Sequence, residues 1–186
     1  MTRRGWSISS RASWSQPGRG EWFTTGNLSK VAQDCIRNVR DFVIADTPAI
    51  FRIMGMESYS SSSLERRRCD LHIHVEHAYR PFSQVYVMGA MYMSLVSLFL
   101  KRRPREDVII FGAVGNAGSL SSNYELDRTY ITVCKNRGYR RVIIGRGTVV
   151  PAEVQAYAEM LLSDGQPAVR LITMNRVLDA VPVYFS

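Results

Sequence analysis

The sequence predicts a folded α/β protein in which strands alternate along the chain with helices. Alternating side chains over residues 69–75 and an apolar run between turns at residues 105–112 are typical of strands. Apolar residues recur at helical spacing over residues 28–45, and residues 85–100 are apolar on nearly all sides. With 186 residues, of which 46% are hydrophobic, the chain is long enough for one domain that buries about 70% of its unfolded surface.

Residues 1–20 form a basic segment that is rich in serine and arginine and contains no acidic residue. Two interpretations stay open. The composition is typical of a mitochondrial targeting segment, which would place the protein in mitochondria rather than in the cytoplasm. The partial alternation of residues 6–14 favours instead a first strand or hairpin.

The first helix is expected over residues 28–45, after a strand within residues 20–28 and with Asn27 as its N-cap. Pro48 should end this helix, because proline disfavours the helical conformation of the residue before it. Residues 49–56 are then a short apolar piece.

The second half of the chain is expected to continue the alternation. Residues 85–100 predict a buried helix rather than a membrane span, because no apolar run with suitable flanks reaches about 18 residues. Residues 112–118 predict a tight glycine turn rather than a phosphate-binding loop, since no helix begins directly after them. The remaining expected elements are a helix at 125–137 ending at Gly138, a strand at 140–145, a helix at 151–162, a strand at 168–173 and a short helix capped by Asn175 and ending at Ala180.

The net charge of +8 comes almost entirely from arginine, since only three of the 24 basic residues are lysines. This excess favours an acidic partner such as RNA, a ribonucleoprotein or an acidic protein surface, although a solvated basic surface has the same composition. The basic run at 101–105 also follows the buried helix, where cations stabilise the helix dipole. The candidate phosphate contacts are Arg66, Arg67, Arg68, Arg102, Arg103, Arg105, Arg140 and Arg141. Arg137 and Arg146 lie near Arg140 and Arg141 in the sequence and extend that group.

Several chemistries are not predicted. No Gly-x-x-x-x-Gly-Lys-Ser/Thr segment is present, so we expect neither an ATPase module nor a bound cofactor. His72 and His74 share one face of a strand, but no carboxylate or cysteine completes a ligand set, so no metal site is predicted. The cysteines show neither a disulfide framework nor a metal spacing, which suits a reducing compartment; they are Cys35, Cys69 and Cys134.

The order of elements from residue 69 to residue 128 resembles the proteolytic domain of the Lon family of ATP-dependent serine proteases. Asp70-Leu-His-Ile-His-Val75 is similar to the family strand Asp-Ile-His-Val-His-Val. Without a gap, Pro81 falls on a family proline, Gly112 and Gly118 on two turn glycines, and Leu126 on the leucine of a Gly-Gly-Leu-Lys motif. The resemblance implies a Lon peptidase domain of the ribosomal-protein-S5-domain-2-like fold over residues 21–186.

The same register places Tyr86 at the nucleophilic serine and Asp127 at the catalytic lysine of the family. The resemblance therefore implies that both members of the Ser/Lys dyad are missing. That dyad needs a hydroxyl able to attack a carbonyl and a neutral amine that accepts its proton. The ring of Tyr86 carries its hydroxyl about 6 Å beyond the backbone. A carboxylate at Asp127, about 4 Å from an oxyanion, would oppose it by roughly 4 kcal/mol at an effective dielectric of 20.

The sequence thus predicts a catalytically inactive Lon-protease-like domain, a pseudopeptidase, that acts as a structural or interaction module in a larger assembly. Expected partners are proteins, including further copies of this chain or an AAA+ ATPase subunit, with RNA or a ribonucleoprotein as a further partner. The alternative is an active Lon-type ATP-dependent serine peptidase domain with a displaced dyad. Ser83 is then the nearest serine, and the amine would come from Lys30, Lys101 or Lys135.

Overall fold

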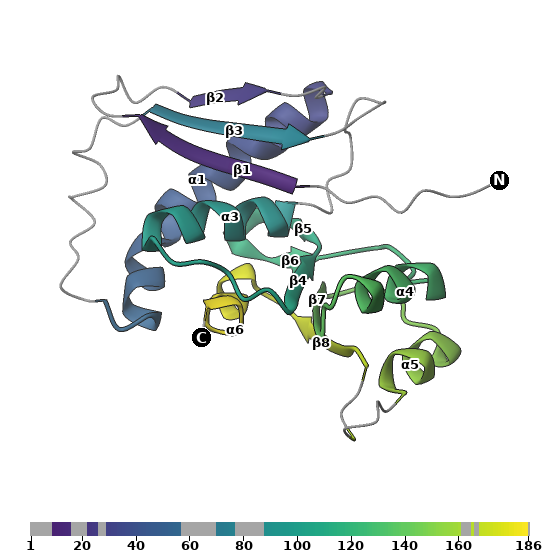
Figure 1. Ribbon diagram of the computed structural model, residues 1–186. Coiled ribbons are helices and arrows are strands. Elements are labelled where there is room, and N and C mark those ends of the chain that lie inside the picture. The colour runs from purple at the N-terminus through teal and green to yellow at the C-terminus, as the bar shows by residue number, and fades with distance from the viewer. Residues whose placement is uncertain are drawn as a thin grey trace.

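The computed structural model describes residues 9–15, 22–25, 29–56, 70–76, 88–160, 165 and 168–185. These residues form a mixed α/β structure with two three-stranded sheets and helices packed between and beside them (Figure 1). The first sheet contains β1 (Ser9–Ser15), β2 (Trp22–Thr25) and β3 (Asp70–Glu76). The second contains β4 (Val108–Phe111), β7 (Arg141–Gly145) and β8 (Arg170–Met174).

In the first sheet, β3 is the central strand. It pairs antiparallel with β1 along seven residues, from Ser9 opposite Glu76 to Ser15 opposite Asp70, and parallel with β2. The strands predicted near residues 6–14, 20–28 and 69–75 are therefore confirmed. Because β1 and β2 lie on opposite sides of β3, they do not form a hairpin with each other.

The first helix is longer than its sequence signals predict. Helix α1 (Lys30–Ile53) continues through Pro48, so the prediction that Pro48 ends it is wrong. A proline inside a helix costs about 3 kcal/mol, because it removes one backbone hydrogen bond and crowds the preceding turn. The next turn buries Ile50 and Phe51 in the core, and each such burial stabilises by about 1.5–3 kcal/mol. The expected apolar piece at residues 49–56 is mostly the last turn of α1.

Helix α3 (Met88–Leu100) is buried over most of its length, which confirms the predicted core helix. It lies between the two sheets, against α1 and β1 on one side and β4 on the other (Figure 1). At its start, the amide of Gly89 donates to the carbonyl of Gly112, with 3.0 Å between nitrogen and oxygen. This bond ties the beginning of α3 to the end of β4.

The second sheet is wholly parallel, in the order β4-β7-β8, and is covered on both faces. Val108, Ile110 and Ile143 face a core that includes α1 and α3. Val142 and Ile144, which alternate with Ile143, belong to a second core with α4 (Arg128–Asn136) and α5 (Ala152–Glu159). A parallel sheet covered on both faces has few polar residues in its strands, which explains the apolar run over residues 142–145.

The glycine turn after β4 also behaves as predicted. Residues 112–118 contain β5 (Ala113–Val114) and a single 3-10 turn, η2 (Asn116–Gly118), before β6 (Leu120–Ser121). Ser121 then passes so close to Gly145 that a β-carbon there would lie 2.7 Å from its backbone. Only glycine fits at the end of β7, so Gly145 allows the turn to pack against the parallel sheet.

Two predicted helix starts are wrong, because the backbone at those positions pairs with another segment of the chain. Glu125 forms a bridge with Val149, so α4 begins at Arg128 and not at residue 125. The carbonyl of Asn175 accepts a hydrogen bond from the amide of Leu120, so Asn175 is not the N-cap. The last helical segments are η3 (Val177–Ala180), which follows Arg176, and α6 (Val181–Phe185).

Candidate functional site

Asp127, which the resemblance aligns with the catalytic lysine of the Lon family, has a defined structural role. It is the N-cap of α4, with extended backbone at φ −111° and ψ 165°. Its Oδ1 accepts a hydrogen bond of 2.8 Å from the amide of Tyr130. Aspartate is a preferred N-cap because this contact satisfies a helix amide that has no partner within the helix. Tyr86, which the resemblance aligns with the nucleophilic serine, and the suggested substitute Ser83 lie outside the described residues, as does Pro81.

All three lysines belong to the described residues. Lys30 and Lys101 are exposed at the start of α1 and just after α3. The amine of Lys135 donates to the carbonyl of Tyr157 at 2.8 Å and lies 3.7 Å from the centre of the tyrosine ring. Within the described residues, no lysine amine is hydrogen-bonded to a serine hydroxyl.

Tyr157 sits in a polar cluster that the sequence reasoning missed. Its hydroxyl lies 3.2 Å from that of Thr132, and the guanidinium of Arg128 lies 4.4 Å from its ring centre. The hydrogen bond with Thr132, aided by the charges of Lys135 and Arg128, lowers the pKa of the phenol against the effect of desolvation. Because Arg128, Thr132 and Lys135 are spaced at i, i+4 and i+7, they lie on one face of α4, and the cluster joins α4 to α5.

A second polar link lies in the core. The buried Tyr92 of α3 donates its hydroxyl to Oδ2 of Asp46 on α1 at 2.7 Å. Burial, followed by the hydrogen bond to Asp46, raises the pKa of Tyr92 far above its ordinary value, so the phenol stays protonated as a donor. The contact fixes the register between two helices, and no sequence pattern connects residues 46 positions apart.

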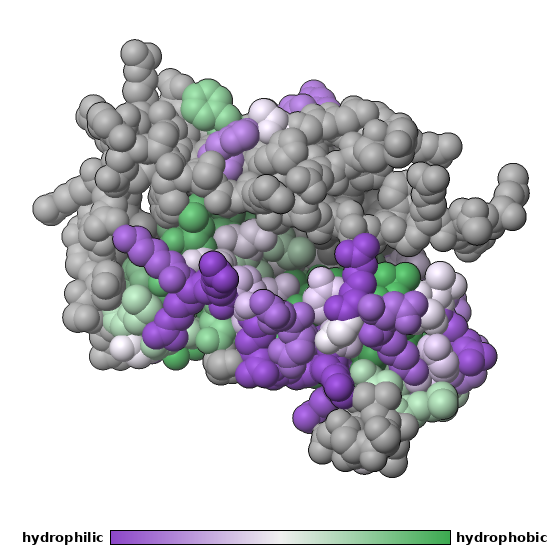
Figure 2. Space-filling model, in the orientation of Figure 1, coloured by the Kyte–Doolittle hydropathy of each residue, from purple (hydrophilic) through white to green (hydrophobic). Residues whose placement is uncertain are grey.

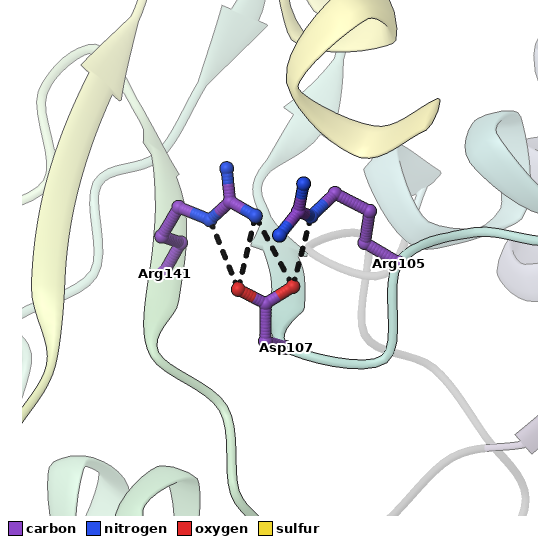
Figure 3. A network of polar contacts seen from close by, with 3 residues as sticks. All are labelled: Arg105, Asp107 and Arg141. Atoms are coloured by element: carbon purple, nitrogen blue, oxygen red, sulfur yellow. Dashed lines mark hydrogen bonds and ion pairs between the residues drawn. The ribbon is translucent and has the colours of Figure 1, made fainter. Parts of the chain in front are cut away.

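The arginines form the most extended group of functional candidates. Arg105 and Arg141 converge on the carboxylate of Asp107 (Figure 3). Arg141 donates from Nη2 to both carboxylate oxygens, at 3.1 and 2.9 Å, and from Nε to Oδ2 at 3.2 Å. Arg105 donates from Nε to Oδ1 at 3.0 Å. One carboxylate therefore holds two guanidinium groups that are 36 positions apart in the sequence.

The pKa of Asp107 responds to opposing effects. Desolvation raises it, but the hydrogen bonds and charges of Arg105 and Arg141 outweigh that effect and hold the pKa below its ordinary value. The carboxylate of Asp107 is therefore ionised in the folded protein at neutral pH, and it holds the side chains of Arg105 and Arg141 in place. Side-chain exposures of 42% for Arg105 and 24% for Arg141 leave both guanidinium groups in contact with solvent.

The structure brings together the two arginine groups that the sequence left apart. Residues 101–107 lead into β4 and residues 137–141 lead into β7, so both segments lie at the amino ends of parallel strands. The amides of Arg140 and Arg141 both donate to the carbonyl of Asp107, at 2.8 and 3.0 Å. Figure 2 shows strongly hydrophilic side chains gathered across the lower part of the face that it displays.

Three further placements follow. Arg170, the first residue of β8, pairs with Arg141 and joins this group, which the sequence reasoning missed. Arg146 follows β7 and lies at the opposite end of the sheet, so it does not extend the basic group as expected. Arg137 is the exposed C-cap residue of α4 and lies four positions before β7 in the chain. The described basic side chains in the segments that lead into β4, β7 and β8 are Lys101, Arg102, Arg103, Arg105, Arg137, Arg140, Arg141 and Arg170, which we call the basic edge. Arg66, Arg67 and Arg68 lie outside the described residues.

The described residues contain no group of three histidine, cysteine or acidic side chains arranged to hold a metal ion. Nε2 of His72 lies 2.7 Å from the hydroxyl of Thr25 on the neighbouring strand, and Cys35 and Cys134 are buried free thiols. Within the described part of the chain, none of the helices combines the length and apolar character needed to cross a membrane.

In comparisons with known proteins, no family model matches this chain. A search of curated proteins likewise finds no match.

Proposed function

We propose that this chain is a catalytically inactive Lon-type proteolytic domain of the ribosomal-protein-S5-domain-2-like fold, which serves as an interaction module in a larger assembly. The observation that carries the proposal is the N-cap contact of Asp127. Where the resemblance expects an amine that accepts a proton, this chain has a carboxylate that caps α4 through the amide of Tyr130.

The placement of the lysines supports the same conclusion. A general base must reach the nucleophile within hydrogen-bonding distance. The amine of Lys135, the lysine nearest to Asp127 in the sequence, is instead bonded to the carbonyl of Tyr157. Arginine stays protonated in proteins and cannot take over the role of the base. The many arginines therefore serve binding rather than proton transfer.

The decisive experiment measures hydrolysis of fluorescein-labelled casein by the purified chain, alone and with an AAA+ ATPase and ATP. The expected result is release of fluorescent peptides at the rate of the buffer control. Two variants test the displaced dyad directly: Ser83→Ala and Lys135→Arg. Hydrolysis by the unmodified chain that either substitution abolishes would show an active peptidase and overturn the proposal.

The assembly would be mitochondrial if residues 1–20 carry a targeting signal. β1 begins at Ser9 and pairs with β3, so cleavage after residue 20 would remove an edge strand of the first sheet. We therefore propose that any targeting signal in this segment is not cleaved off and remains part of the folded protein. A fluorescent fusion of the full chain that stays in the cytoplasm would contradict the mitochondrial proposal.

A further inference from the structure

We propose that the basic edge binds the phosphate backbone of single-stranded RNA. This inference rests on the proposed function as a non-catalytic interaction module and names the partner of that module. It assigns the phosphate-binding role to the amino ends of β4, β7 and β8.

The topology of the parallel sheet makes this edge continuous. All three strands begin on the same side, and neighbouring strands lie about 4.8 Å apart, so their starts span about 10 Å. Arg141 and Arg170 occupy paired positions on β7 and β8 and therefore project from the same face of the sheet. The loop that ends at Asp107 lies beside them, because the carbonyl of Asp107 accepts both amides at the start of β7. Arg105, Arg141 and Arg170, from three separate segments, thus lie close together.

This surface carries a large excess of positive charge. Segments 101–107, 137–141 and 168–170 contain eight basic side chains and two acidic ones, Glu106 and Asp107. The carboxylate of Asp107 is bonded to Arg105 and Arg141, so it does not neutralise the charge of the remaining basic side chains. Clustered positive charge of this kind attracts polyanions and raises their rate of association.

Asp107 also orders part of the surface before a ligand arrives. It fixes the guanidinium of Arg141 through Nε and Nη2, so Nη1 points away from the carboxylate (Figure 3). Flexible arginines lose side-chain entropy when they bind a phosphate, and a guanidinium that is already held loses less. Arg105 and Arg141 are therefore the ordered centre of the edge, and Arg102, Arg103, Arg140 and Arg170 are its exposed surroundings.

RNA fits this surface better than an acidic protein does. Protein interfaces depend on apolar or aromatic anchors that become buried at their centre. The exposed large hydrophobic residues of the described chain are Phe23, Val31, Ile44, Ile53, Val149 and Met160, and none belongs to the edge segments. The edge does contain Tyr139, which is partly exposed between Arg137 and Arg140. An aromatic ring among arginines suits a single strand, whose unpaired bases stack on such rings.

The test measures binding of a fluorescein-labelled oligouridine by fluorescence anisotropy over a series of KCl concentrations. Two triple variants of the full chain, each lacking three exposed positive charges, are compared. The edge variant is Arg102→Gln, Arg140→Gln and Arg170→Gln. The matched control is Arg37→Gln, Arg52→Gln and Arg146→Gln, whose positions lie on α1 or at the opposite end of the sheet.

Each single-strand phosphate contact contributes about 0.7 to the slope of log affinity against log salt, or about fivefold between 1 M and 0.1 M salt. The edge variant should therefore bind about 100-fold more weakly near 0.1 M salt, with a slope smaller by about 2. The control should keep most of the affinity and the slope. Because all six positions are exposed, both variants should unfold at the same temperature as the unmodified chain.

Three results would overturn the proposal: no binding of oligouridine by the unmodified chain, equal losses in both variants, or equal displacement by poly-L-glutamate and unlabelled oligouridine at the same charge concentration. The third result would favour an acidic protein partner. Casein hydrolysis measured on the same preparations separates the two proposals. An inert chain without RNA affinity would leave the pseudopeptidase proposal standing, whereas hydrolysis together with edge-dependent RNA binding would remove only the pseudopeptidase proposal.

Discussion

The carboxylate of Asp107 and the guanidinium of Arg141 form a forked ion pair, in which Nη2 of Arg141 contacts both carboxylate oxygens. The pair joins the loop before β4 to the first residue of β7, and Arg105 completes it from within the same loop. In this cluster, residues of the candidate binding surface also hold the fold together. Its removal should therefore affect both stability and binding.

Asp107→Asn should lower the free energy of unfolding by about 1–2 kcal/mol at pH 7, because charge-assisted hydrogen bonds are weakened while two arginines stay close together. The pKa of Asp107 in the folded state lies below its ordinary value of 3.8. The stabilisation is therefore present above the unfolded pKa and is lost as the pH falls through the lower folded value. Urea unfolding followed by circular dichroism should show the difference between the two proteins narrowing below pH 3.8. Glu106→Gln removes a neighbouring exposed carboxylate and serves as the control; an equal effect of both substitutions would contradict the role of Asp107.

Asp127→Ala should destabilise the protein by about 1 kcal/mol, because the amide of Tyr130 loses its acceptor at the start of α4. Asp127→Ser keeps a capping oxygen and should retain most of the stability. Asp127→Lys introduces the residue type that the resemblance expects but places a cation at a helix N-terminus, so it should be at least as unstable as the alanine variant. Thermal unfolding of the three variants measures this order, and a lysine variant as stable as the serine variant would disprove the capping role.

Tyr92→Phe should cost about 1–3 kcal/mol, because Asp46 loses a hydrogen-bond donor in a partly buried position. The measurement is a double-mutant cycle with Asp46→Ala, using urea unfolding. The two substitutions should be coupled, with the double variant clearly less destabilised than the sum of the single variants. If the effects simply add, the contact between α1 and α3 contributes no stability of its own.

Pro48→Ala should stabilise the protein by about 1–3 kcal/mol, because it supplies the missing amide inside α1 and removes the clash with the preceding turn. Pro182 is the matched control, since it lies in the first turn of α6, where a helix amide needs no partner within the helix. Pro182→Ala should therefore change the melting temperature little or lower it slightly. A decrease for Pro48→Ala would show that the backbone of α1 at this position suits proline better than alanine.

The alternation of strands and helices was predictable because it depends on local periodicity. β3 and the buried α3 follow directly from the patterns at residues 69–75 and 85–100. The end of α1 was mispredicted because the local signal at Pro48 is weaker than the burial of the next turn. Asn175 was mispredicted as an N-cap because its carbonyl bonds to Leu120, which is 55 positions away. Local rules fail at these points because contacts with distant segments outweigh the local signal.

Sequence alone established the α/β class, the excess of arginine and the presence of Asp127 where the resemblance expects a lysine. These are properties of single positions or short windows, and side-chain chemistry and periodicity suffice to read them. Tertiary structure alone decided that Asp127 caps a helix, that Arg105 and Arg141 share one carboxylate, and that Arg170 rather than Arg146 belongs to the basic edge. The order and direction of the strands bring these side chains together, and that order depends on packing between segments far apart in the chain.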